Sequence, residues 1–420
     1  HKSGDLNILL KETTYFKDHL VKRAKEIDKN FSQKDFLLRT KYKKLYKGSL
    51  LEHLLIQNIV PFFNVGEHNI IKLENADWND GLDMAAKRGE SVAFSFMYAH
   101  NLTVLCILLE KLKEKIKRVK ILKELTILLD RINKPINYNS FKEKQKLLEV
   151  YLEKTKSISG EKLKIDIDKI IKDLKEKSIH LGNWLRKKEW LEFGFFNGYY
   201  DNKGKRVEGK FKNKTRLMLA SQVFAIMSGI PTKEQIKQIF ISVKKYLKDK
   251  NLGGFRLNTN FYIPHYLDLG RAFGFSYGDK ENGAFFNHMV IMFAFALYKQ
   301  GPIKEANEVF SSIYKMATNS KSEIYPMIPE YFNAEGKGLY FYLTGSGSWY
   351  IYTLLEEVLG IKFRFGDILI KPKFNSSLLF DRKIEVKFNI YNRILRVSYL
   401  CKKKKNIFNL KSVFLENKEI

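Results

Sequence analysis

The hydrophobic and polar positions along most of the chain repeat with the period of an amphipathic helix. Residues 166–181, DIDKIIKDLKEKSIHL, place isoleucine and leucine three or four positions apart with charged residues between them. This spacing gives a helix one apolar face and one solvated face. Gly229 and Gly301, each followed closely by proline, mark helix ends. The pattern predicts helices over 49–63, 91–115, 117–133, 141–155, 163–181, 214–228, 232–248, 284–300, 302–316 and 346–359.

Four long connections between these helices are rich in glycine, asparagine, aspartate and aromatic residues. They span 64–90, 190–213, 251–283 and 325–345. Loops of this length within a compact domain usually carry function, and their aromatic content is untypical of disorder. We expect all four to gather at one end of a helical barrel.

The pattern changes from about Phe363 onward. Segments 366–374, 383–401 and 406–415 alternate apolar and polar residues, with turn residues between them, which is typical of β-strands. The chain is therefore predicted to be mainly α-helical, with a helical domain over 1–362 and a small β-sheet region over 363–420 packed behind it.

The net charge of +29 among 420 residues raises the question of a nucleic-acid partner. The lysines are spread along the predicted helix faces, however, and do not form one block. Lysine also greatly outnumbers arginine, whose planar fork suits base and phosphate recognition. The pattern favours a solvated, lysine-rich surface, and we expect no nucleic-acid partner.

The two cysteines, Cys106 and Cys401, supply neither a disulfide framework nor a metal-ligand set. This usage fits a reducing compartment and predicts a cytoplasmic protein. We expect neither a signal peptide nor a membrane span, because the most apolar stretch, 92–109, carries His100 and Asn101 and is typical of a buried helix. The chain begins at His1 without an initiator methionine, so we also expect a fragment of a longer protein.

The densest candidate site is Asp77-Trp78-Asn79-Asp80-Gly81. It opens like a calcium-binding EF-hand loop, but the glycine falls one place early and Arg88 stands where the loop needs glutamate. We therefore predict no metal site. An ordinary Asp-Gly turn is one interpretation. The other is a sugar site, because an indole can stack on the apolar face of a pyranose while acids and amides bind its hydroxyls.

Two further segments suggest a ligand. In ENGAFFNHMVIMF (281–293), Glu281 stands near a helix start and His288 about two turns further in. In YLTGSGSW (342–349), Thr344 can cap the next helix and Gly345 allows a ligand to approach the backbone, so the free N–H groups can bind an anion. Taken singly, a core histidine and a plain helix cap explain them. Together with Asp80 they indicate a carbohydrate pocket with an anion seat.

Four motifs in this order resemble the inverting glycoside phosphorylases of the cellobiose and chitobiose phosphorylase group, formerly placed in glycosyltransferase family 36. The resemblance runs from the first residues to about position 375. The motifs are DWNDG (77–81), RGESV (88–92), KENGAFFNH (280–288) and YLTGSGSW (342–349).

The resemblance implies an (α/α)6 helical toroid with its active site at one end. It also implies that this chain lacks the first helices of the toroid and the N-terminal β-sandwich of the family. It also implies cleavage of a β-linked gluco-oligosaccharide by inorganic phosphate, with release of an α-sugar 1-phosphate and without a cofactor. The site residues it implies are Asp80 as general acid; Trp78, Asp77, Gln222 and Glu281 as sugar-binding residues; and His288, Thr344 and Gly345 as phosphate-binding residues.

The family's phosphate-clamping arginines belong to its upstream part, so Arg39, Arg256 and Arg271 are not assigned that role. The expected partners are the oligosaccharide, phosphate, and either a second copy of the chain or a separately encoded N-terminal half. Two other functions remain open. One is an inverting hydrolase or glycan-synthase accessory domain on the same barrel, and the other is an inactive carbohydrate-binding remnant.

Overall fold

The structure is a computed structural model. It describes residues 1–16, 20–21, 26–27, 36–262, 266–325, 327–341, 345–374, 383–390, 393–400, 414–415 and 418–419.

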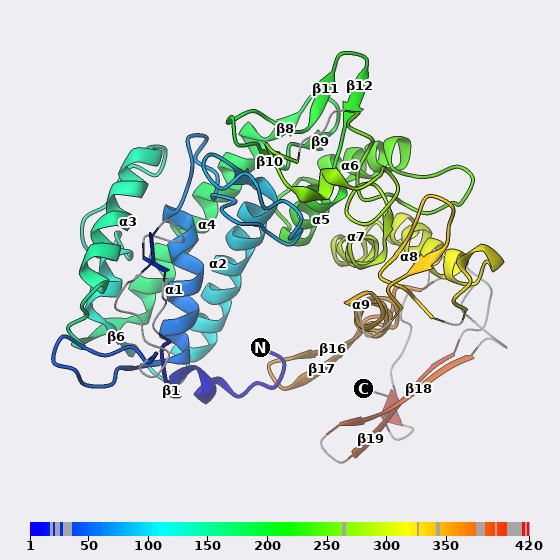
Figure 1. The fold of residues 1–420 in the computed structure, drawn as a ribbon. Coiled ribbons are helices and arrows are strands. Elements are labelled where there is room, and N and C mark those ends of the chain that lie inside the picture. Colours follow the sequence, from blue (N-terminus) through cyan, green and yellow to red (C-terminus); the bar gives the residue numbers. More distant parts are fainter. Residues whose placement is uncertain are drawn as a thin grey trace.

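The α-helices of the described part form two layers that follow an arc (Figure 1). In the inner layer each helix contacts the next: α1 (Leu50–Phe63), α2 (Val92–Lys113), α5 (Leu219–Ser228), α7 (Asn287–Gln300) and α9 (Gly345–Thr353). An outer helix packs on each of the first four: α3 (Phe141–Thr155) on α1, α4 (Ile167–Lys188) on α2, α6 (Lys233–Tyr246) on α5 and α8 (Ile303–Ala317) on α7. The predicted mainly helical fold is confirmed.

Sequence composition explains which helices lie inside. Residues Met289–Tyr298 of α7 are all buried, so this helix has core on every side. The outer helix α4 instead buries one stripe and exposes lysines on the opposite face. Helix α2 is long and apolar enough to cross a membrane by composition, but it packs between α1, α4 and α5 as a core helix.

The helix predicted over 117–133 is wrong. Residues Arg118–Leu122 form strand β6, which pairs antiparallel with β7 (Lys162–Asp166). Val119 and Ile121 point into the core while Lys120 is exposed, which is the two-residue period of a strand. The same pairing explains why the helix predicted over 163–181 begins only at Ile167, where Asp166 caps it, and it continues to Lys188.

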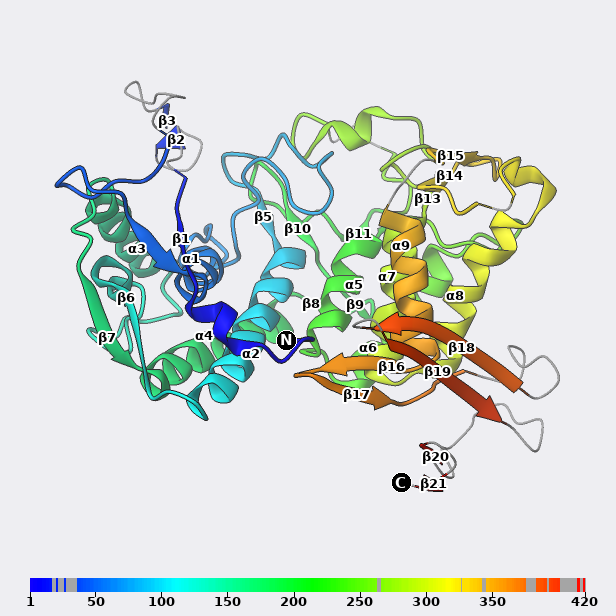
Figure 2. The same cartoon turned by 90° about the horizontal axis from the view of Figure 1, so that it is seen from below.

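Short strand pairs stabilise the loops. Strand β5 (Glu90–Ser91) pairs with β10 (Tyr199–Tyr200), and β13 (Phe285–Phe286), β14 (Tyr331–Phe332) and β15 (Gly338–Leu339) form a three-stranded sheet. Figure 2 shows these strands at one end of the helices, where loops 64–90, 251–283 and 325–345 line one cavity; strand β10 brings part of the fourth loop, 190–213, to the same end by pairing with β5. The other described pairs are β1 (Glu12–Thr14) with β4 (Lys47–Ser49), β2 (Leu20–Val21) with β3 (Glu26–Ile27), β8 (Trp190–Leu191) with β9 (Phe195–Phe196), and β11 (Gly209–Phe211) with β12 (Lys214–Arg216).

The C-terminal region contains β-hairpins at the opposite end of the helices (Figure 2). Strand β16 (Ile361–Arg364) pairs with β17 (Asp367–Ile370), β18 (Lys383–Ile390) with β19 (Arg393–Leu400), and β20 (Phe414–Leu415) with β21 (Lys418–Glu419). The Tyr399 hydroxyl donates to the Leu359 carbonyl at 2.5 Å and joins the second hairpin to the helical part. The strands predicted within 366–374 and 383–401 are confirmed, whereas Cys401 and residues 406–413 lie outside the described residues. The domain boundary at 362 stays a prediction.

The N-terminal residues link the two ends of the helix series. The 3-10 helix η1 (Leu6–Leu10) contacts α1 and α2, while the Phe365 N–H donates to the His1 carbonyl at 2.7 Å. The N-terminus therefore lies beside the β16–β17 turn, as Figure 1 shows.

Candidate active site

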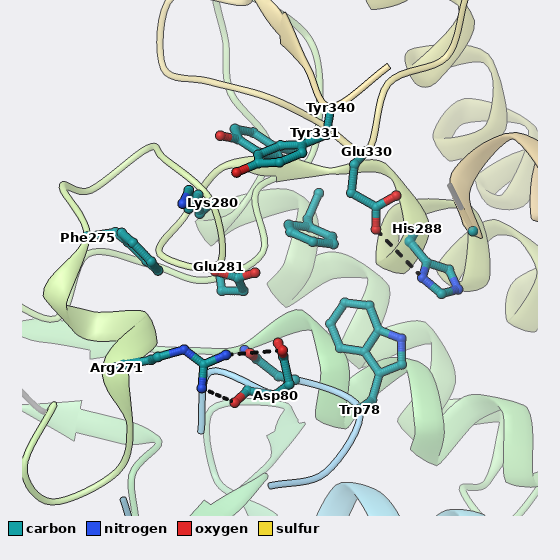
Figure 3. A pocket seen from close by; sticks show the side chains of 13 residues that line it. Trp78, Asp80, Arg271, Phe275, Lys280, Glu281, His288, Glu330, Tyr331 and Tyr340 are labelled. Carbon is teal, nitrogen blue, oxygen red and sulfur yellow. Dashed lines mark hydrogen bonds and ion pairs between the residues drawn. The ribbon is translucent and has the colours of Figure 1, made fainter. Parts of the chain in front are cut away.

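A cavity of about 680 Å³ opens at the loop end of the helices (Figure 3). Three of the four long loops and the starts of α7 and α9 contribute to it. It is lined by Trp78, Asn79, Asp80, Arg271, Phe275, Lys280, Glu281, Phe286, His288, Glu330, Tyr331, Tyr340 and Gly345. Three candidate segments from the sequence, 77–81, 281–293 and 342–349, therefore contribute residues to one cavity.

Asp77 anchors the loop that carries Trp78 and Asp80. Its carboxylate accepts hydrogen bonds from the Asn79 N–H at 2.9 Å and the Ser91 hydroxyl at 2.8 Å. The same hydroxyl caps α2 by accepting from the Phe94 N–H at 2.9 Å. Burial of the carboxylate raises the pKa of Asp77. Asp77 was expected to bind sugar, but it is absent from the cavity lining and instead fixes the loop to the start of a core helix.

Asp80 projects into the open cavity, and its side chain is 78% exposed. The Arg271 guanidinium donates to the Asp80 carboxylate at 3.1 Å and to the Asp80 carbonyl at 2.8 Å. Arg271 also pairs with Asp83. The charged partner of Asp80 is therefore a cation on the neighbouring loop.

The two loops approach closely because both carry glycine. A Cβ atom on Gly270 would lie 2.0 Å from the Gly81 carbonyl oxygen, so no side chain fits there. A second acid, Glu281, lies near this junction, and burial together with the charge of Asp80 raises the pKa of Glu281.

Trp78 and Phe286 form the apolar floor of the cavity. Their ring centroids are 5.6 Å apart in a T-shaped arrangement, and the His288 ring lies 5.5 Å from Trp78. Trp78 is half-buried, so part of the indole remains available to a flat ligand.

His288 lies in the first turn of α7, not two turns inside as predicted, because Phe285 and Phe286 form strand β13. Its imidazole is 21% exposed, with Nδ1 4.0 Å from the Glu330 carboxylate. Burial lowers the pKa of His288, and the nearby Glu330 charge opposes that shift only partly. The lowered pKa favours the neutral ring, which can donate one N–H to an anion.

Gly345 begins α9 and lies against His288. A Cβ atom on Gly345 would lie 2.8 Å from ring atoms of His288, so glycine is required by this close contact. The predicted capping residue Thr344 lies outside the described residues. Ser346 donates to the Glu330 carboxylate at 3.1 Å, which joins the start of α9 to the same wall.

Gln222 does not line the cavity. Its fully buried side-chain amide donates to the Phe196 carbonyl at 2.8 Å and accepts from the Phe196 N–H at 3.0 Å. The expectation that Gln222 binds sugar is therefore corrected: its hydrogen bonds fix strand β9.

Sequence reasoning missed four cavity residues with chemical potential: Arg271, Lys280, Glu330 and Tyr340. Lys280 stands inside the quoted motif KENGAFFNH and was available as a signal. Arg271 had none, because its partner Asp80 is 191 positions away. Among the residues that the structure describes, no group of three or more His, Cys, Asp or Glu side chains is arranged to hold a metal.

The catalytic-domain model of the glycosyl hydrolase 94 superfamily matches residues 10–139 and 147–360. Two curated proteins are similar to the chain. A solabiose phosphorylase of Paenibacillus borealis is 23% identical over 336 residues, which cover 77% of this chain and 37% of that protein. A cellobionic acid phosphorylase of Neurospora crassa is 24% identical over 177 residues, or 39% of this chain and 22% of that protein. The chain thus aligns with little more than a third of the length of the first relative and less than a quarter of the second.

Solved structures show only a distant likeness. An uncharacterized conserved protein of Thermus thermophilus has a TM-score of 0.33 at 13% identity, covering 63% of this chain and 47% of that one. A GH63 mannosylglycerate hydrolase of the same organism, in complex with glucose, has a TM-score of 0.34 at 13% identity, covering 63% and 46%.

Proposed function

The chain belongs to the glycosyl hydrolase 94 superfamily, and from this premise we propose that it is the catalytic domain of an inverting glycoside phosphorylase. Its substrate is a β-linked gluco-oligosaccharide, which inorganic phosphate cleaves to an α-sugar 1-phosphate. One observation carries the proposal: Asp80 shares a cavity with His288 and Gly345. The two phosphorylase relatives support the same reaction type.

The acid acts on the leaving group. Asp80 donates its proton to the glycosidic oxygen as the bond from that oxygen to C1 breaks, and a phosphate oxygen forms a new bond to C1 from the opposite face. An inverting hydrolase needs a second carboxylate to deprotonate water. Phosphate is already an anion and needs only positioning, so a single acid suffices.

The proposed phosphate-binding site, the anion seat, lies where the first turns of α7 and α9 meet. The neutral His288 imidazole donates one N–H, and the N-terminus of α9 at Gly345 supplies backbone N–H groups and the positive end of the helix dipole. Trp78 supports the sugar ring between this seat and Asp80, while Glu281 binds hydroxyl groups. The reaction requires a protonated Asp80, so we infer that its ion pair with Arg271 opens when substrate binds.

The two-layer arc fits the same proposal. Inner helices that contact one another in series, each backed by an outer helix, are the construction of an (α/α)6 toroid, and we infer that the arc is part of one. No cofactor is required, since phosphate is a co-substrate.

The test is phosphorolysis of a panel of β-linked disaccharides. We expect the protein, incubated with cellobiose, laminaribiose, sophorose or chitobiose plus phosphate, to release a sugar 1-phosphate from at least one of them, measured by ³¹P NMR. Release of reducing sugar without phosphate would assign a hydrolase instead. Sugar binding without turnover of any donor would assign the non-catalytic remnant.

A further inference from the structure

Glu330 is an acid that lies against the anion seat. Its side chain lines the cavity and is 21% exposed. One carboxylate oxygen, Oε2, accepts a hydrogen bond from the Ser346 hydroxyl at 3.1 Å, and the other, Oε1, lies 4.0 Å from Nδ1 of His288. Ser346 follows Gly345 in the first turn of α9, and His288 lies in the first turn of α7. Glu330 therefore contacts one half of the seat and faces the other.

The backbone holds Glu330 in this place independently of its side chain. The Asn287 N–H donates to the Glu330 carbonyl at 2.8 Å, and the Glu330 N–H donates to the Tyr340 carbonyl at 2.9 Å. Strand β14 begins at the next residue and pairs with β13, which directly precedes α7. Glu330 is thus fixed relative to the start of α7, and Figure 3 shows its carboxylate directed toward the His288 ring. A change of the side chain alone leaves these backbone contacts in place.

An acid in this position makes the seat sensitive to the protons that an anion carries. A carboxylate can only accept hydrogen bonds. Inorganic phosphate keeps at least one proton at neutral pH, so one oxygen can donate to Glu330 while the others accept from the His288 N–H and the backbone of α9. Sulfate has the same tetrahedral shape but no proton, so it meets the Glu330 charge without a compensating hydrogen bond. Among the residues that the structure describes, no hydrogen bond reaches Oε1 of Glu330, so this oxygen is available as the acceptor.

We propose that Glu330 is a specificity-determining residue that selects a protonated anion, hydrogen phosphate, and discriminates against sulfate. This inference rests on the proposed function and concerns the choice of its nucleophile. The hydrogen bond to Glu330 engages the protonated oxygen of phosphate, which leaves an unprotonated oxygen to form the bond to C1. Arsenate also keeps a proton at neutral pH and should be accepted in the same way.

The test compares anions with and without a proton on matched variants. Equilibrium binding of phosphate, arsenate and sulfate is measured calorimetrically at neutral pH and constant ionic strength, with glucose present. Sulfate is then added as an inhibitor to the phosphorolysis of a disaccharide that the protein cleaves. Both measurements give the affinity for sulfate relative to that for phosphate.

Three variants are compared with the unaltered protein. Glu330→Gln removes the charge and supplies an N–H donor, whereas Glu330→Asp keeps the charge. Glu335→Gln is the control, because Glu335 is exposed on the same segment outside the cavity lining and its replacement changes the net charge equally. Thermal unfolding of each variant checks that it is folded.

We expect the unaltered protein to bind phosphate and arsenate at least about 10-fold more tightly than sulfate. Glu330→Gln should raise the affinity for sulfate about 10- to 100-fold, which corresponds to the gain of one hydrogen bond to a charged ligand. Phosphate should not bind more tightly to this variant, because it loses a charged acceptor for its proton. Glu330→Asp should keep sulfate binding weak, and Glu335→Gln should change the affinity for neither anion.

Two results would overturn the inference. One is equal affinity for phosphate and sulfate in the unaltered protein, and the other is a parallel change for both anions in Glu330→Gln, as expected of a merely structural residue. A failure of the proposed function looks different, because the anions are then discriminated while no disaccharide releases a sugar 1-phosphate, whatever residue occupies position 330. If the unaltered protein binds none of the three anions, the inference and the anion seat are both wrong.

Discussion

Two clusters of charged side chains in this molecule have opposite organisation. Around Lys177, which is completely buried, the ammonium group lies 2.8 Å from an Asp130 oxygen and also pairs with Asp173, while the Tyr138 hydroxyl donates to Asp130 at 2.8 Å. In the cavity, Asp80 is largely exposed, His288 is neutral, and Lys280 has no carboxylate partner among the described residues.

This difference in pairing indicates that the Lys177 cluster stabilises the fold, whereas the cavity residues are available to bind a ligand. A buried charge must be neutralised by its neighbours, because desolvation is expensive, so the Lys177 cluster is complete without a ligand. The cavity groups are partly solvated and incompletely paired, so a ligand can still satisfy them. Changes to the first cluster should therefore affect folding, and changes to the second should affect binding and turnover.

The largest expected effect is on the acid. Asp80→Asn keeps the shape of the side chain but cannot deliver the proton, so kcat for phosphorolysis should fall about 100- to 10,000-fold. The thermal midpoint should change little, because the side chain is exposed. Asp83→Asn is the control, since it also contacts Arg271 but does not line the cavity. Equal kcat in the Asp80 variant and the unaltered chain would contradict the assignment.

The opposite result is expected in the buried cluster. Lys177→Met leaves Asp130 and Asp173 without their shared cation, which should cost about 3–5 kcal/mol in the free energy of unfolding. Denaturant titration measures this cost, and kcat of the folded fraction should be preserved. Loss of turnover in a variant of unchanged stability would break the distinction between the two clusters.

His288 should affect phosphate more than sugar. His288→Asn replaces the imidazole by a shorter side chain that no longer reaches the phosphate. The KM for phosphate should therefore rise about 10- to 100-fold, which corresponds to the loss of one hydrogen bond to a charged ligand. The KM for the disaccharide should change much less. His180→Asn, remote from the cavity, is the matched control. A selective loss of disaccharide affinity would place His288 on the sugar instead.

The remaining prediction concerns the stability, not the turnover, of the protein: the effect of the buried acid Glu208 depends on pH. Burial raises the pKa of Glu208 to about 8. The folded state therefore holds a proton that the unfolded chain releases, and its contribution to stability is lost as the pH rises toward 8. Glu208→Gln removes this dependence. In denaturant titrations its free energy of unfolding should lie below that of the unaltered chain at pH 5 and above it at pH 9, with the difference between the two proteins changing by about 4 kcal/mol over this range. If the free energies of unfolding of the variant and the unaltered chain changed in parallel with pH, the raised pKa of Glu208 would be contradicted.

Local pattern predicted the parts of the molecule that depend on local sequence. The helix periodicity, the glycine and proline boundaries, and the aromatic and acidic loop at 77–81 were recognisable because each is set by neighbouring residues. The motif resemblance added His288 and Gly345 to the same site.

Long-range pairing explains most of the errors. Residues 118–122 have the composition of a helix end but form a strand because 162–166 pairs with them. The amide of Gln222 faces inward because Phe196 supplies both of its hydrogen-bond partners. Arg271 reaches Asp80 only because Gly81 and Gly270 let two distant loops interlock. The cytoplasmic location, the absence of a cofactor, and a second subunit or N-terminal half stay predictions.

The most direct test of the account is a crystal structure of the protein grown with inorganic phosphate and a sugar. The account predicts a tetrahedral anion within hydrogen-bond distance of the His288 imidazole and the Gly345 N–H, with the sugar on Trp78 and Asp80 on its far side. Phosphate bound on the Asp80 side of the sugar, or outside this cavity while the sugar occupies it, would contradict the account.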